Sequence, residues 1–118
     1  MGLELSMITI DCADPRVLTD FWTQALGVAV EADYGPFVML ARPGGDGPAL
    51  AFQQVPEPRT VKNRVHIDFS APDREAEVKR LVGLGASEQE RHAQPGIEWT
   101  VLADPEGNVF CVAQAGAH

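Results

Sequence analysis

Polar and apolar residues alternate along the segment 5–12, which reads LSMITIDC. Side chains of a β-strand point alternately to its two faces, so a period of two predicts a half-buried strand. One face would carry Ile8, Ile10 and Cys12, and the other Met7, Thr9 and Asp11. Helical spacing follows in the segment 14–27, where one apolar face would consist of Val17, Leu18, Phe21, Trp22, Ala25 and Leu26. Asp14 suits the N-cap and Gly27 the left-handed position after the last turn, so we predict a helix between them.

The same order of elements occurs twice. In the first half, strands are predicted at about 28–33, 36–42 and 48–55 after the helix. A proline-containing linker at about 56–62 precedes a strand at 63–70 and a helix at 73–85, whose apolar positions are Ala76, Val78, Leu81, Val82 and Leu84. Strands at about 87–91, 96–103 and 109–113 follow, with the turn DPEGN at 104–108. We therefore predict one domain over 1–118, built from two βαβββ modules at about 3–57 and 63–115.

Alternation also predicts two chemically different faces for these sheets. Apolar residues occupy one face of four strands: Ile8, Ile10, Leu50, Phe52, Ile67, Phe69, Phe110 and Val112. Small or polar residues occupy the other: Met7, Thr9, Asp11, Ala49, Ala51, Gln53, His66, Asp68, Ser70, Val109, Cys111 and Ala113. We expect helices to cover the first face, and the second to form the wall of a ligand site.

Charge and cysteine content narrow the range of functions. The net charge of −8 argues against partners with phosphate backbones or anionic headgroups, so neither nucleic acid nor a membrane surface is expected. Two cysteines, Cys12 and Cys111, show no repeated spacing, which argues against a disulfide framework or a zinc cluster. The N-terminus lacks the features of a signal peptide, and no apolar run is long enough to span a membrane. We expect a cytoplasmic protein with reduced thiols.

Three segments resemble the vicinal oxygen chelate superfamily, which includes glyoxalase I, extradiol dioxygenases and bleomycin- or fosfomycin-resistance proteins. They read ITIDCADPRVLTDFWTQALG, VHIDFSAPDREAEVKRLVGLGA and WTVLADPEGNVFCV, and they cover nearly the whole chain in the family's order. The sequence is most similar to the glyoxalase-like domain branch. This resemblance implies an α+β fold in which two βαβββ modules form a cupped mixed sheet with helices on its outer face. It also implies a homodimer in which both subunits complete each cup.

In the metal-using members of the superfamily, four inward-facing residues hold a divalent ion. The resemblance places these positions at Met7, Gln53, His66 and Cys111, of which only His66 is the expected residue type. Hard ions such as Mg²⁺ and Mn²⁺ favour carboxylates, and this set contains none. We therefore expect neither a metal nor another cofactor. The alternative is a divalent ion held with the help of a carboxylate from Asp11 or Asp68.

His66 is the best single candidate for function. Its imidazole, close to Asp68, could act as a general base or donate to a ligand, whereas the alternative is a sheet histidine satisfied by its neighbours. Trp99 could stack on a planar ligand or belong to the core, and Cys111 is expected to be buried and inert. The predicted ligand-binding residues are Met7, Thr9, Asp11, Gln53, His66, Asp68, Trp99 and Cys111, and His66 is also the candidate catalytic residue.

Two functions from different classes follow. The first is a metal-independent protein that binds or sequesters a small compound, either cationic or planar, as the resistance-type members do. The second is an enzyme, a glyoxalase-like lyase, isomerase or dioxygenase, that works through His66 with or without a divalent metal. The sequence does not name the ligand.

Overall fold

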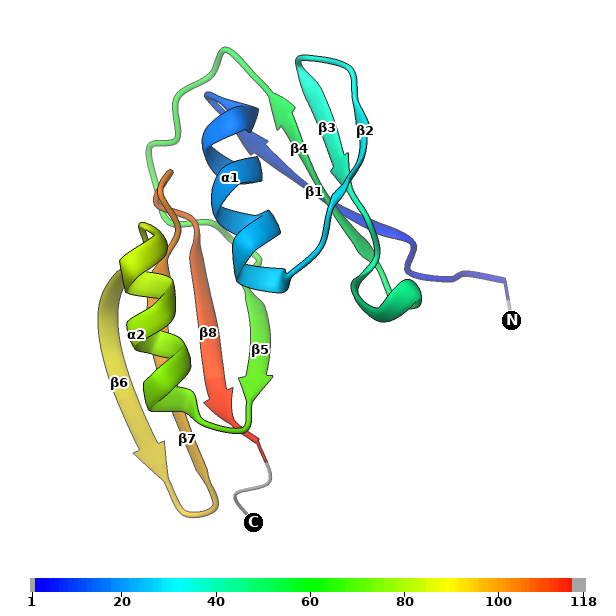
Figure 1. Cartoon of the computed structure of the whole chain (residues 1–118). Helices are drawn as coiled ribbons and strands as arrows, with labels where there is room; N and C mark the ends of the chain where they lie inside the picture. The colour runs from blue at the N-terminus through cyan, green and yellow to red at the C-terminus, as the bar shows by residue number, and fades with distance from the viewer. Residues whose placement is uncertain (1, 116–118) are drawn as a thin grey trace. The chain divides into compact units, whose positions relative to one another are not determined.

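Each half of the chain folds as a four-stranded mixed sheet with one long helix on one face (Figure 1). The computed structural model describes residues 2–115, and the chain divides into two compact units between Pro58 and Arg59. We call the unit before this point module 1 and the unit after it module 2. Among the described residues, no helix is long and apolar enough to cross a membrane. The predicted pair of βαβββ modules is confirmed.

Module 1 begins with the strand β1 (Met7–Cys12) and the helix α1 (Pro15–Leu26). The strands β2 (Val30–Asp33), β3 (Phe37–Leu40) and β4 (Ala49–Gln54) follow, with a short 3₁₀ turn, η1 (Pro43–Gly45), before β4. The strand order is β1-β4-β3-β2. β1 pairs with β4 in parallel, whereas the pairs β3–β4 and β2–β3 are antiparallel.

The helix α1 forms between the predicted caps and supplies the core of module 1. The Asp14 carboxylate accepts a hydrogen bond from the Arg16 backbone N–H, and Gly27 adopts the left-handed conformation at φ 67°. Buried side chains of α1 meet β3 and β4: Leu18, Phe21 and Trp22 from the helix, and Val38, Leu40, Leu50 and Phe52 from the strands. Val17 was predicted on this face but is exposed, because it lies about 100° around the helix from Leu18.

Module 2 repeats this arrangement. Its elements are β5 (Ile67–Ala71), α2 (Arg74–Leu84), β6 (Ser87–Gln94), β7 (Ile97–Ala103) and β8 (Val109–Gln114). The strand order is β5-β8-β7-β6, with β5 parallel to β8 and the other pairs antiparallel. The turn DPEGN joins β7 to β8, and its buried Asp104 carboxylate accepts hydrogen bonds from the backbone N–H groups of Glu106 and Asn108.

The apolar face of α2 is narrower than its sequence predicts. Val78 and Leu81 are buried, but Ala76 and Val82 are exposed and Leu84 is half-buried. Arg74 is buried instead, with its guanidinium 3.7 Å from Glu75 and 3.8 Å from Glu98. The aliphatic stem of an arginine can cover apolar surface while its head keeps ionic partners, so this charged residue replaces part of the expected stripe.

Two strand boundaries in module 2 differ from the predictions. The strand predicted at 63–70 begins only at Ile67, so His66 lies just before β5. The segment that precedes it is held by side-chain hydrogen bonds from Asn63 rather than by a strand ladder. β6 extends to Gln94, because its pairing with β7 continues past a bulge between Glu88 and Glu90. His92, expected in a loop, therefore lies in a strand.

Candidate functional site

The face of the second sheet opposite α2 carries most of the chemistry in module 2, and we call it the open face. Strand pairing places Asp68, Cys111, Val101 and Glu90 in one row across the sheet. The next row contains Ser70, Ala113, Trp99 and His92. Phe110 and Val112 point to the other side and are buried, as alternation requires.

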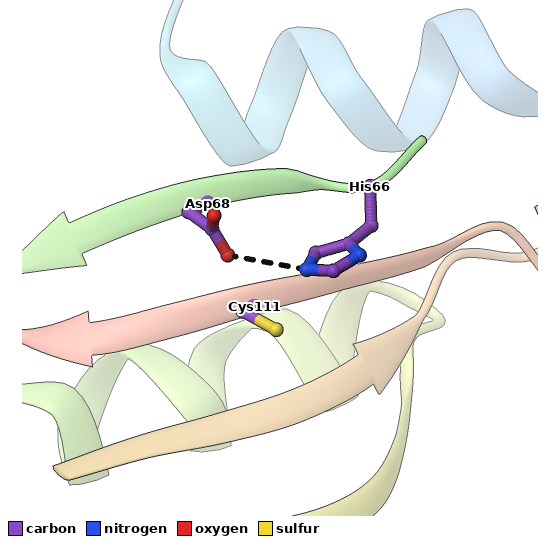
Figure 2. Close-up of side chains that lie close together, drawn as sticks. All are labelled: His66, Asp68 and Cys111. Atoms are coloured by element: carbon purple, nitrogen blue, oxygen red, sulfur yellow. Dashed lines mark ion pairs between the residues drawn. The ribbon is translucent and has the colours of Figure 1, made fainter. Parts of the chain in front are cut away.

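His66, Asp68 and Cys111 come together at the β5 edge of this face. Figure 2 shows the imidazole, the carboxylate and the thiol pointing toward one another from the residue that precedes β5, from β5 and from β8, respectively. The His66 Nε2 atom lies 3.6 Å from Asp68 Oδ1, and one ligand atom from each of the three residues lies within 4.8 Å of the others. The side chains of His66 and Asp68 are 43% and 71% exposed, whereas Cys111 is buried. Exposed acid–base groups therefore border a buried thiol.

The Cys111 thiol is held in its neutral form. Removal from water raises its pKa, and the charge of Asp68 and a hydrogen bond from the thiol to that carboxylate raise it further. The positive charge of Lys62 acts in the opposite direction but is the smallest of these causes. Cys111 is buried, as the sequence predicts, and a neutral thiol is a poor nucleophile.

An aromatic pair occupies the β6–β7 side of the open face. The rings of His92 and Trp99 stack with their centroids 5.0 Å apart and their planes inclined by 23°. The His92 Nε2 atom lies 3.0 Å from Glu90 Oε1, so the carboxylate anchors the outer ring of the stack. Trp99 is half-buried, with one face toward His92. The sequence left two positions open for Trp99, stacking on a planar ligand or packing in the core. In the structure its ring is half-buried and stacks on His92.

Module 1 carries the remaining predicted residues on the corresponding face of its own sheet. Asp11 lies opposite Gln53, Thr9 opposite Ala51, and Met7 opposite Ala49. Met7 is thus four residues from the Gln53 row, about 13 Å along the strands. The structure brings Asp11 and Gln53 together but separates Met7 from Gln53.

The four positions that the resemblance assigns to a metal, Met7, Gln53, His66 and Cys111, do not suit a hard divalent ion. Met7 and Gln53 are far apart in module 1, and none of the four mapped residues is a carboxylate. Among residues 2–115, the group that could hold a metal is His66, Asp68 and Cys111. An imidazole, a carboxylate and a thiol suit a borderline ion such as Zn²⁺ better than Mn²⁺ or Mg²⁺, but the raised pKa of Cys111 opposes the thiolate that zinc prefers.

Sequence reasoning missed two residues of this face, His92 and Glu90. Both were assigned to a loop or to the end of a short strand, because SEQERHAQ contains few apolar residues. Every residue of β6 is exposed, so no hydrophobic period marks the strand. The alternation of Glu90 and His92 was the available signal, but exposed charge is common and points to no function by itself.

Comparison with known proteins gives the family. The model of the glyoxalase-like domain family matches residues 7–113. Among proteins with curated descriptions, none matches the sequence.

Solved structures with the same fold are similar over nearly the whole chain. A glyoxalase/bleomycin resistance protein/dioxygenase family enzyme from Burkholderia phytofirmans PsJN has a TM-score of 0.77 at 22% identity, over 94% of this chain and 98% of that one. A fosfomycin resistance protein, FosX, from Listeria monocytogenes, solved with Mn(II) and 1S,2S-dihydroxypropylphosphonic acid, has a TM-score of 0.81 at 16% identity, over 97% and 91%. A glyoxalase family protein from Bacillus cereus has a TM-score of 0.71 at 15% identity, over 96% and 94%. The fold agrees with the family match, and the chain belongs to the glyoxalase-like domain family.

Proposed function

We propose that this protein binds a small planar compound on the open face of module 2, without the divalent ion used by metal-dependent relatives. The observation that carries the proposal is the stacked pair of His92 and Trp99 on the same face as the exposed Asp68 and His66. A stacked aromatic platform with a few polar groups beside it is the usual composition of a small-molecule site.

Charge favours a ligand that carries a positive group or several hydrogen-bond donors. Asp68 and Glu90 are the carboxylates of the row that also contains Cys111 and Val101, and the whole chain has a net charge of −8. A cation on this face would gain attraction from both carboxylates, and its ring could stack on Trp99. We therefore expect planar cations to bind better than planar anions of the same size.

A thermal-shift screen in EDTA tests the proposal, with benzamidine and larger planar cations compared against benzoate and its homologues. We expect at least one planar cation to raise the melting temperature of the wild-type protein, and Trp99→Ala and Asp68→Asn each to reduce that shift. Thr60→Ala, an exposed substitution in the segment before β5, is the control that should leave it unchanged. Stabilisation that appears only when a divalent metal is added would contradict the proposal.

The second candidate is an enzyme in which His66 acts as a general base. The observation that favours it is the 3.6 Å approach of His66 Nε2 to Asp68 Oδ1, since a carboxylate beside an imidazole can orient the ring toward a substrate. The reaction would be that of a lyase, an isomerase or a dioxygenase, as in the family's catalytic members.

The two candidates differ in what His66→Gln does. If the protein only binds its ligand, this substitution weakens binding by a modest factor, because one polar contact is lost. If His66 is a base, turnover of a planar carbonyl or catechol substrate falls by about 10²-fold or more while binding is largely kept. Turnover and binding measured on the same preparation separate these outcomes.

We also propose that the chain forms a homodimer. Several large apolar side chains are exposed, among them Leu3, Leu5, Val61 and Val65, and exposed apolar surface is typical of protein interfaces. Sedimentation velocity across a range of concentrations should give a dimer, and a monomer at all concentrations would contradict this expectation.

A further inference from the structure

The segment 59–66 lies against the β7–β8 turn and the start of β8. Arg59 reaches Gly107, where a methyl group in place of the α-hydrogen would collide with its guanidinium. Lys62 is close enough to Cys111 to influence its pKa. Asn63 is hydrogen-bonded to Val109, the first residue of β8. The last residue of this segment is His66, which directly precedes β5 and is not part of the strand.

Asn63 takes the place of a strand partner for Val109. Its side-chain oxygen accepts a hydrogen bond of 2.8 Å from the Val109 backbone N–H, and its side-chain nitrogen donates one of 3.1 Å to the Val109 carbonyl. The same nitrogen donates to the carbonyl of Val65 at 2.7 Å. One half-buried amide therefore connects the start of β8 to the residue immediately before His66.

We infer that Asn63 is a positioning residue that holds His66 beside Asp68 and Cys111. His66 lacks the ladder hydrogen bonds that fix the residues of β5, and its imidazole is 43% exposed, so the backbone in front of it must be held in another way. The bond from Asn63 to the Val65 carbonyl fixes that backbone relative to β8, the strand that carries Cys111. This inference rests on the proposed function for its biological meaning, although the geometry can be tested without a ligand.

A purely structural role for Asn63 predicts a different result from a positioning role. If Asn63 only tied the segment to β8, its loss would expose the Val109 amide and lower stability but leave the imidazole next to Cys111. If it positions His66, the imidazole moves away as well. Val109 amide exchange and the contact between the His66 ring and the Cys111 side chain, both measured by NMR, report these two events separately.

The experiment compares the wild-type chain with Asn63→Ala, Asn63→Asp and the control Thr60→Ala, an exposed substitution in the same segment. In Asn63→Ala we expect Val109 amide exchange to accelerate about tenfold, as the loss of a hydrogen bond allows, and the nuclear Overhauser contact between His66 and Cys111 to disappear. In Asn63→Asp the acceptor for Val109 remains but the donor to Val65 is lost. Protection of Val109 should then be kept while the His66 contact weakens. Thr60→Ala should behave as wild type in both measurements.

The inference is overturned if Asn63→Ala exposes the Val109 amide and leaves the His66–Cys111 contact intact, or if it changes neither signal. If Asn63→Ala does not fold, the aspartate variant decides, and a wild-type His66 contact in that variant overturns the inference. Neither signal requires a bound compound. A failure of the planar-ligand screen would therefore leave this test standing, and a failure here would leave the screen unaffected.

Discussion

Burial and the neighbouring Asp68 act together on the thiol of Cys111. Removal from water is the largest cause of its raised pKa, and the charge and the hydrogen bond of Asp68 raise it further. A carboxylate beside a buried thiol is unfavourable for thiolate chemistry, which is why we assign the polar functions of this cluster to His66 and Asp68. The reactivity of Cys111 measures this arrangement directly.

Asp68→Asn should therefore lower the pKa of Cys111 and make it react faster. The ordinary thiol pKa is 9.0, and the folded protein raises it, so alkylation by iodoacetamide should have its midpoint above that value. In the asparagine variant the charge is gone and only burial raises the pKa, so the midpoint should fall. Mass spectrometry of a Cys12→Ala background over a pH series measures it, with Asp11→Asn as the matched control in module 1. An unchanged midpoint in Asp68→Asn would show that the carboxylate does not act on the thiol.

The residues of the candidate site were predictable to different degrees. A period of two assigns Asp68 and Cys111 to one face, and the structure brings them together with His66. Asn63 could not be found in this way, because its function depends on a side chain that reaches Val109, 46 positions later in the chain. Local pattern contains no information about such a contact.

At the scale of elements, two glycines have different backbone roles, because one ends the helix α1 and the other lies inside the helix α2. Gly27 ends α1 at φ 67°, in the left-handed region that side chains disfavour. Gly83 lies inside α2 with helical backbone and has open space where a methyl group would be placed. The same substitution should therefore have opposite effects at these sites.

Gly27→Ala should lower the free energy of unfolding by about 1 kcal/mol, because a side chain is strained at positive φ. Gly83→Ala should raise it by about 0.5–1 kcal/mol, because alanine loses less backbone freedom in a helix. Urea unfolding of both variants measures the two values. A loss of stability in Gly83→Ala would indicate that α2 is constrained in a way that its backbone does not reveal.

Arg91 connects β6 to α2 through two carboxylates. It donates to Glu75 of α2 at 2.7 Å and to Glu88 of β6 at 2.6 Å, and these hydrogen bonds are the largest cause of the lowered pKa of each carboxyl. A carboxyl with a lowered pKa in the folded state stabilises the protein above its unfolded pKa and loses that effect as the pH falls through its folded pKa.

Arg91→Gln should therefore reduce stability at neutral pH, and the difference from wild type should shrink as the pH falls below about 4.5, the ordinary value of these carboxyls. Urea unfolding at a series of pH values measures this difference. Arg80→Gln is a useful comparison, since Arg80 forms an ion pair with Glu77, three residues away within α2. If the difference in stability between Arg91→Gln and wild type does not change with pH, the ion pairs of Arg91 with Glu75 and Glu88 do not contribute in this way.

Element boundaries were predictable where caps or turns mark them. Asp14 and Gly27 bracket α1, Asp73 caps α2, and DPEGN joins β7 to β8. Boundaries set by tertiary contacts were not predictable from the sequence. β5 begins later than predicted, at Ile67, and β6 extends further than predicted, to Gln94. A strand in which all residues are exposed has no apolar period to reveal its end.

At the scale of the whole molecule, the sequence repeat predicts the architecture but not the strand register. Aligning the two halves at Asp14 and Asp73 equates Thr9 with Asp68, and aligning them at Gly27 and Gly85 equates Gln53 with Cys111. Cys111 lies opposite Asp68 in module 2, but in module 1 Gln53 lies opposite Asp11 rather than Thr9. The parallel pairs in the two modules are therefore offset by two residues, which keeps side chains on the same face. Each module consequently presents different neighbours around its equivalent positions.

This asymmetry concentrates the candidate chemistry in module 2. Module 1 places Asp11 beside Gln53 and stacks Tyr34 against Phe37 with ring centroids 6.4 Å apart, but its face has no histidine. Module 2 combines His66, Asp68 and the His92–Trp99 stack. For this reason the proposed ligand is assigned to module 2.

The most direct test of that assignment is NMR chemical-shift mapping with the planar cation that gives the largest thermal shift in EDTA. The chain has two tryptophans, of which Trp99 is half-buried on the open face and Trp22 is 3% exposed in the core of module 1. We predict that the signals of the Trp99 indole and the His66 ring shift together as the compound saturates the protein, while the signal of the Trp22 indole does not move. Saturable binding that leaves Trp99 and His66 unchanged would contradict it.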